Sequence, residues 1–121
     1  MPKTTKAHFK LFRKYVKKYM KKWKVMGWTV YFYHIDLGNN MARYDANYRD
    51  GSVSFSLTTK WCKYVSLTEK EIKKAAKHEV AHILIDPLYS LGLEISVSED
   101  ELGTIDERLV NQLVELLPEV K

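Results

Sequence analysis

The chain of 121 residues has the size of one domain and is long enough to build a hydrophobic core without disulfide support. Its hydrophobic content of 45% and aromatic content of 12% are typical of a globular protein and exclude a disordered chain. No stretch approaches the roughly 20 apolar residues that cross a bilayer, no secretory signal is recognisable, and a lone cysteine, Cys62, excludes a cysteine-rich zinc module. We therefore expect one domain covering residues 1–121, cytoplasmic, monomeric and without membrane contact.

The first 24 residues carry a strong positive charge, with ten Lys or Arg and no acid, whereas the remainder carries ten bases and fifteen acids. Apolar residues recur there at steps of three and four, which predicts a helix from about Thr4 to Lys24. The lysines on its other side form either a solvated helix face or a surface that binds nucleic acid through phosphate contacts. The apolar positions are Phe9, Phe12, Val16, Tyr19 and Trp23.

The middle of the chain has the composition of β-strands. Residues 28–37 are rich in aromatic and β-branched residues and predict a first strand. Residues 42–48 and 52–59 flank the pair Asp50-Gly51, which favours a type I′ hairpin turn. In the second of these segments apolar and polar residues alternate, so we expect a half-buried strand. Its apolar residues are Val53, Phe55 and Leu57.

A second helix has a clear start signal. Thr68 is placed as the N-cap, and Glu71 follows three residues later, which is the spacing of a capping box. The helix is predicted to run from about Glu69 to Ile85 and to end at Asp86, because Pro87 disfavours helical geometry in the residue before it.

After a connection over residues 87–97, a last helix is expected to continue to about Leu117. It begins after either Ser98 or Thr104, since each has a glutamate three residues later, and we favour one helix with a weak point at Gly103. The order of elements implies an α+β fold in which an N-terminal helix, a small antiparallel or mixed sheet of about three strands, and two further helices follow one another.

The pentapeptide His78-Glu79-Val80-Ala81-His82 is an HExxH motif inside the second predicted helix. Residues four apart lie one turn above each other, so the two imidazoles can bind one metal ion. Glu79 is rotated to the side, where it can act as a general base on a metal-bound water without being a ligand itself. The motif therefore predicts zinc-assisted hydrolysis of a peptide bond, unless the two histidines have this spacing by accident.

The third protein ligand remains open at this point. A carboxylate from the last helix would complete a His₂Glu site, with water in the fourth position. Helical periodicity places Asp106 under an apolar stripe and Glu107 at its edge, which does not single out one acid. The stripe consists of Leu102, Leu109 and Leu113, and the candidate acids are Glu94, Glu99, Asp100, Glu101, Asp106 and Glu107.

The segment HEVAHILIDPLY, followed about 25 residues later by ERLVNQL, resembles small gluzincin-type (HExxH…E) zinc metallopeptidases and metallopeptidase domains of phages and bacteria. The resemblance implies a zincin-like domain that binds one Zn²⁺ through His78, His82 and Glu107, with Glu79 as the general base. It further implies a metalloendopeptidase that acts on a peptide or protein substrate in a bacterial or phage-infected cell.

Further expectations concern the substrate and the alternatives. The strand with Val53 and Leu57, if it is the edge of the sheet, could pair with a substrate peptide. An oxyanion could be stabilised by a tyrosine or by His34, although each is more simply a packing residue. The alternative function is a catalytically silent or regulatory zincin-fold protein that acts by binding protein or nucleic acid. The candidate tyrosines are Tyr31, Tyr33, Tyr44, Tyr48 and Tyr89.

Overall fold

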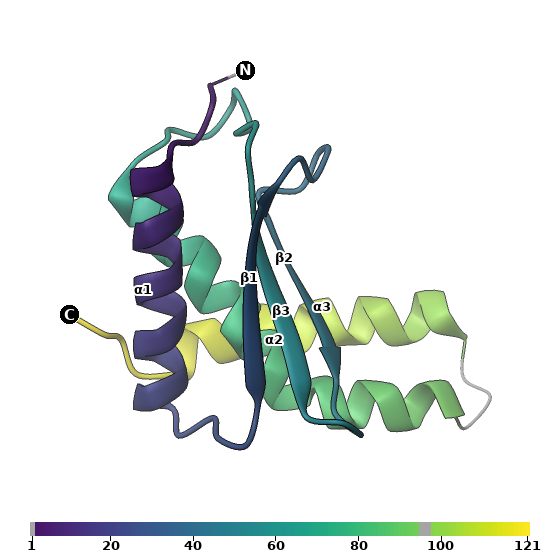
Figure 1. The fold of residues 1–121 in the computed structure, drawn as a ribbon. Coiled ribbons are helices and arrows are strands. Elements are labelled where there is room, and N and C mark those ends of the chain that lie inside the picture. The colour runs from purple at the N-terminus through teal and green to yellow at the C-terminus, as the bar shows by residue number, and fades with distance from the viewer. Residues whose placement is uncertain (1, 95–97) are drawn as a thin grey trace.

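The chain folds into three helices and a three-stranded sheet (Figure 1). The computed structural model describes the backbone of residues 2–94 and 98–121, and the side chains of residues 2–87 and 98–121. The expected α+β class is confirmed. In chain order the elements are α1 (Lys6–Lys22), β1 (Thr29–Ile35), β2 (Ala42–Asn47), β3 (Ser52–Thr58), α2 (Glu69–Glu94) and α3 (Glu99–Leu116).

Helix α1 begins where Thr5 caps it, because the Thr5 hydroxyl accepts a hydrogen bond from the His8 amide at 3.3 Å. The predicted apolar face is the buried one, and Phe12, Val16 and Tyr19 on it are fully buried. Most of the basic side chains lie on the opposite, exposed side. The periodicity of this segment therefore reports its packing correctly.

The sheet is mixed, with the strand order β1-β3-β2. Strand β3 pairs in parallel with β1 and antiparallel with β2. As predicted, Val53, Phe55 and Leu57 point into the core, with exposed fractions of 1% or less. Because β3 is the middle strand and β1 and β2 are the outer strands, the condition under which β3 could pair with a substrate peptide is not met.

The hairpin between β2 and β3 differs from the predicted type I′ turn. Asn47 pairs with Ser52, so four residues lie between the strands instead of two. Gly51 has a φ of +73°, but Asp50 does not adopt a positive φ, and a type I′ turn requires positive φ at both central residues. The Gly51 amide donates to the Asn47 carbonyl at 2.9 Å and closes the loop.

Helices α1 and α2 cover one face of the sheet (Figure 1). The ring of Phe9 in α1 stacks on His34 of β1 at 5.0 Å, and Tyr44 of β2 stacks on His82 of α2 at 4.6 Å. On the opposite face of β1, Tyr31 is 51% exposed. The core thus lies between the sheet and these two helices.

Helix α2 is longer than predicted, because it does not end at Asp86 but continues through Pro87 to Glu94. Proline lacks an amide hydrogen, so the Ile83 carbonyl loses its helical donor. Helices α2 and α3 contact each other, and the local preference against helix in the residue before proline does not end α2 at Asp86.

Helix α3 is one continuous helix that includes Gly103, as expected. Ser98 is its N-cap, and its hydroxyl accepts from the Glu101 amide at 3.4 Å. The predicted stripe is wrong in part, since Leu109 is 41% exposed while the buried side chains are Asp106 and Val110. No helix in the described ranges is both long and apolar enough to cross a membrane.

Candidate metal centre

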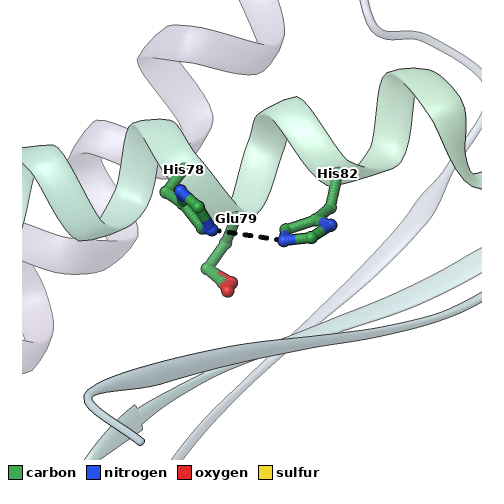
Figure 2. Close-up of side chains that lie close together, drawn as sticks. All are labelled: His78, Glu79 and His82. Carbon is green, nitrogen blue, oxygen red and sulfur yellow. Dashed lines mark hydrogen bonds between the residues drawn. The ribbon is translucent and has the colours of Figure 1, made fainter. Parts of the chain in front are cut away.

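The buried face of α2 determines where the HExxH side chains point. Ile72, Ala76 and Val80 are fully buried and fix the rotation of the helix against the core. The start of α2 is set by Thr68, whose hydroxyl accepts from the Glu71 amide at 3.3 Å. Figure 2 shows the resulting arrangement, with His78 and His82 one turn apart and the Glu79 carboxylate between them on the same side of the helix.

Three side chains from two helices converge on one point. Nε2 of His78 and Nε2 of His82 are 3.3 Å apart. From α3, Glu107 places Oε1 2.9 Å from Nε2 of His82 and Oε2 3.4 Å from Nε2 of His78. Ligands at about 2.0 to 2.1 Å from a tetrahedral zinc ion are separated by about 3.3 Å. The spacing therefore fits the shared coordination of one ion.

Asp106 contacts the other nitrogen of the same imidazole, with Oδ2 3.2 Å from Nδ1 of His82. The two nitrogens of an imidazole point in different directions, so Asp106 does not share the side on which Glu107 lies. With the proton on Nδ1, His82 donates to Asp106 and presents the Nε2 lone pair to Glu107. Nε2 of His82 and the Glu107 carboxylate are then two acceptors in close contact, which is favourable when both bind one cation.

Glu79 is buried, with 7% of its surface exposed, and its Oε2 has no hydrogen-bond partner among the described residues. Burial, together with the smaller effect of the negative charges of Glu107 and Asp106, raises the pKa of this carboxyl to about 8. A buried carboxyl oxygen without a protein partner is the arrangement expected of a group that serves water or substrate.

Burial lowers the pKa of both histidines below the ordinary value of 6.5, and for His78 the neighbouring His82 lowers it further. The nearby carboxylates act in the opposite direction but do not reverse the shift. Both imidazoles are consequently neutral near pH 7, which is the form that binds metal ions.

The structure separates the other candidates that the sequence offered. Tyr44 stacks on His82 with an angle of 18° between the rings, so it lies beside the site. Tyr31 and Tyr33 lie on the far face of the sheet, and His34 contacts Thr4 and Phe9 instead. The side chains of Tyr89 and Glu94 lie outside the described residues.

Among the candidate acids with described side chains, those that group with the histidines are Asp106 and Glu107. Glu99, Asp100 and Glu101 instead form the exposed first turn of α3. Within the described residues, the groups that could hold a metal ion are His78 with Glu79 and His82, and His82 with Asp106 and Glu107. The sequence had suggested Asp106 as a possible ligand and missed its contact with Nδ1 of His82. The sequence signal that could have found this contact is the position of Asp106 under the apolar stripe of the last helix.

No protein-family model, curated protein or solved structure matches the chain. The inference of function therefore depends on the residues of the site and their geometry.

Proposed function

We propose that the protein is a zinc-dependent metallopeptidase in which His78, His82 and Glu107 bind one zinc ion and Glu79 is the general base. The observation that supports it most strongly is the convergence of two imidazole nitrogens and a carboxylate at 2.9 to 3.4 Å, beside a buried carboxyl without a partner. A His₂Glu donor set with a position left for water is typical of catalytic zinc. Structural zinc sites instead use four protein ligands.

The roles of the protein groups follow from their contacts. A zinc ion bound here would supply Lewis acidity, which lowers the pKa of water and polarises a carbonyl group. Glu79 accepts the proton of the attacking water and passes it to the leaving amine. Asp106 keeps the proton of His82 on Nδ1, which leaves Nε2 available as a ligand. Placing a positive charge near Glu79 favours its ionised form and offsets the effect of burial on its pKa.

A cleft of about 480 Å³ leads to this group of residues. His78, Glu79 and Glu107 line it together with Met41 and Ala42, where β2 begins. Strand β2 is an outer strand of the sheet, so its edge beside the cleft is available for an extended peptide by strand addition. The sheet edge that could hold the substrate is therefore β2, and not the β3 segment considered in the sequence analysis.

The ligand assignment is tested by the zinc content of the purified protein and its variants. We expect about one zinc per chain in the wild type, and loss of zinc in His82→Ala and Glu107→Ala. Glu101→Ala is the matched control, because Glu101 is an exposed acid on the same helix and should not affect zinc. Zinc retained in Glu107→Ala would refute its role as the third ligand.

The catalytic assignment is tested by Glu79→Gln, which keeps the size of the side chain but cannot accept the proton. We expect hydrolysis of fluorescently labelled casein by the wild type, loss of at least about a hundredfold of this activity in the variant, and unchanged zinc content. Bound zinc with no hydrolysis by the wild type would favour the alternative of a regulatory zincin-fold protein. Equal hydrolysis by both proteins would exclude Glu79 as the base.

A further inference from the structure

The last four residues of the chain lie against α1 and α2 as an extended peptide (Figure 1). The Trp23 indole donates to the Pro118 carbonyl at 2.7 Å, and Lys73 donates to the Val120 carbonyl at 2.6 Å. Lys18 donates to the carbonyl oxygen of Lys121 at 2.6 Å. These side chains bind the tail through its backbone, as a peptide-binding surface would.

The side chain of Glu119 enters a set of donors that the two helices hold in place. The hydroxyl of Tyr19 donates to Glu119 Oε2 at 2.7 Å, Lys77 forms a close ion pair with Oε1, and Lys73 lies 3.8 Å away. Tyr19 is fully buried, and the side chain of Lys77 is only 12% exposed. The hydrogen bond from Lys77 lowers the pKa of Glu119, in keeping with a bound carboxylate. The donors are thus arranged to recognise a carboxylate.

These donors belong to a cavity of about 780 Å³ that adjoins the candidate metal centre. Four lysines at steps of three and four along α2 line it, which places them on one face of the helix. Glu115 and Glu119 are the acids that line it, so positive charge is in excess. His78 and Lys74 line both this cavity and the cleft of the metal centre, so the two spaces meet there. The four lysines are Lys70, Lys73, Lys74 and Lys77.

Lys74 is the lysine best placed to meet a ligand. Its side chain is exposed, and no ion pair holds it within the described part of the chain. Lys73 and Lys77, in contrast, are already engaged by Glu119. A peptide in the cleft that extends past His78 would bring its side chains beside Lys74, where a carboxylate would find a partner.

We propose that this lysine-lined cavity binds an acidic side chain of the peptide substrate, and that Glu119 occupies it in the free protein. The proposal rests on the proposed peptidase function, since it specifies the substrate class of the same site. An acidic substrate side chain replaces Glu119 at the donors and gains the additional charge of Lys74. Removing the charge of Glu119 therefore strengthens binding of the acidic substrate, and removing the charge of Lys74 weakens it.

The test measures peptide binding without turnover. In zinc-loaded full-length protein carrying Glu79→Gln, fluorescence anisotropy compares an alanine-rich peptide that contains one Glu with the same peptide containing Gln. We expect the Glu peptide to bind about fivefold more tightly or better. Lys74→Gln should remove this preference, Glu119→Gln should increase the affinity for the Glu peptide, and Lys63→Gln, at an exposed lysine outside the cavity, should change neither.

Equal affinity for the two peptides, or an unchanged preference in Lys74→Gln, would overturn the proposal. Stronger competition by a single-stranded oligonucleotide than by the Glu peptide would also overturn it, because phosphates would then be the preferred ligands. Casein hydrolysis by the wild type is measured separately. Hydrolysis without a preference for the Glu peptide would refute the acidic subsite alone, whereas a preference without hydrolysis would refute the peptidase function alone.

Discussion

Replacing Asp106 with Asn tests whether the contact at Nδ1 of His82 supports metal binding at Nε2. Asn has nearly the same size, and its amide oxygen can still accept from Nδ1, but the negative charge is lost. Asp106 is 8% exposed and lies 3.2 Å from Nδ1, so water has little access to this contact and compensates poorly for the lost charge. We therefore expect weaker zinc binding in a protein that folds normally.

The magnitude follows from the position of Asp106 behind a ligand. Loss of such a partner weakens metal binding by about 10- to 100-fold, which corresponds to about 1.4 to 2.8 kcal/mol. At saturating zinc this difference appears in full as lost stabilisation of the folded state. For 121 residues the entropy of unfolding is about 0.25 kcal/mol/K, so the zinc-dependent rise in Tm should be smaller by about 5 to 11 °C.

The assay is differential scanning calorimetry of each protein with zinc and with a chelator. Taking the difference between the two Tm values removes any effect of the substitution on the metal-free protein. Asp100→Asn is the matched control, because Asp100 is an exposed acid in the first turn of the same helix. If Asp106→Asn and Asp100→Asn show the same zinc-dependent rise as the wild type, Asp106 has no part in supporting the ligand.

Three further predictions concern stability. Gly103→Ala should raise the free energy of unfolding by about 0.5 to 1 kcal/mol in urea denaturation, because alanine favours the helix and the added Cβ has room. Outside the adjoining residues and helix backbone, no atom of the described residues lies within 4 Å of it; a decrease would contradict this. Val110→Ala should lower it by about 2 kcal/mol in the same assay, since the side chain is fully buried, and an unchanged value would mean that its surroundings close the gap. The pKa of Glu119 is lower in the folded protein than the ordinary value of 4.5, so its ionised carboxylate stabilises the fold at pH values above 4.5. The wild type should therefore have a higher Tm than Glu119→Gln, and this difference should disappear as the pH falls from 4.5 through the folded-state pKa. A difference that grows in acid would contradict the ion pair with Lys77.

Local sequence patterns predicted the elements whose structure depends on neighbouring residues. The apolar spacing in α1 matched its buried face, and the alternation in β3 predicted the burial of Val53, Phe55 and Leu57, because helix and strand geometry set these faces. The expected half-buried strand is wrong for the end of β3, where Ser56 and Thr58 are buried as well. The pair His78 and His82 was similarly recognisable, since one helical turn brings them together whatever the rest of the chain does. The capping signal at Thr68 also predicted the start of α2 correctly, and Ser98 is the one of the two predicted N-caps that begins α3.

Long-range packing decided the features that the sequence did not predict. The strand order depends on which strands meet across the sheet, and no local pattern distinguishes a middle strand from an edge. Helix α2, which contacts α3, continues through Pro87 against the local preference. Asp106 looked like one of several acids, because its role requires the rotation of α3 relative to His82. Glu107 was singled out only through a family resemblance.

The parallel pairing of β1 with β3 has a consequence for the order in which the sheet assembles. Strands β2 and β3 are joined by four residues and can form a hairpin within microseconds. The first residues of the β1–β3 ladder, Thr29 and Ser52, are 23 positions apart, so β1 must find a partner across a longer closed loop. We expect β1 to join the sheet after the hairpin has formed, with α1 packed behind it. Amide exchange during refolding should then protect β2 and β3 earlier than β1.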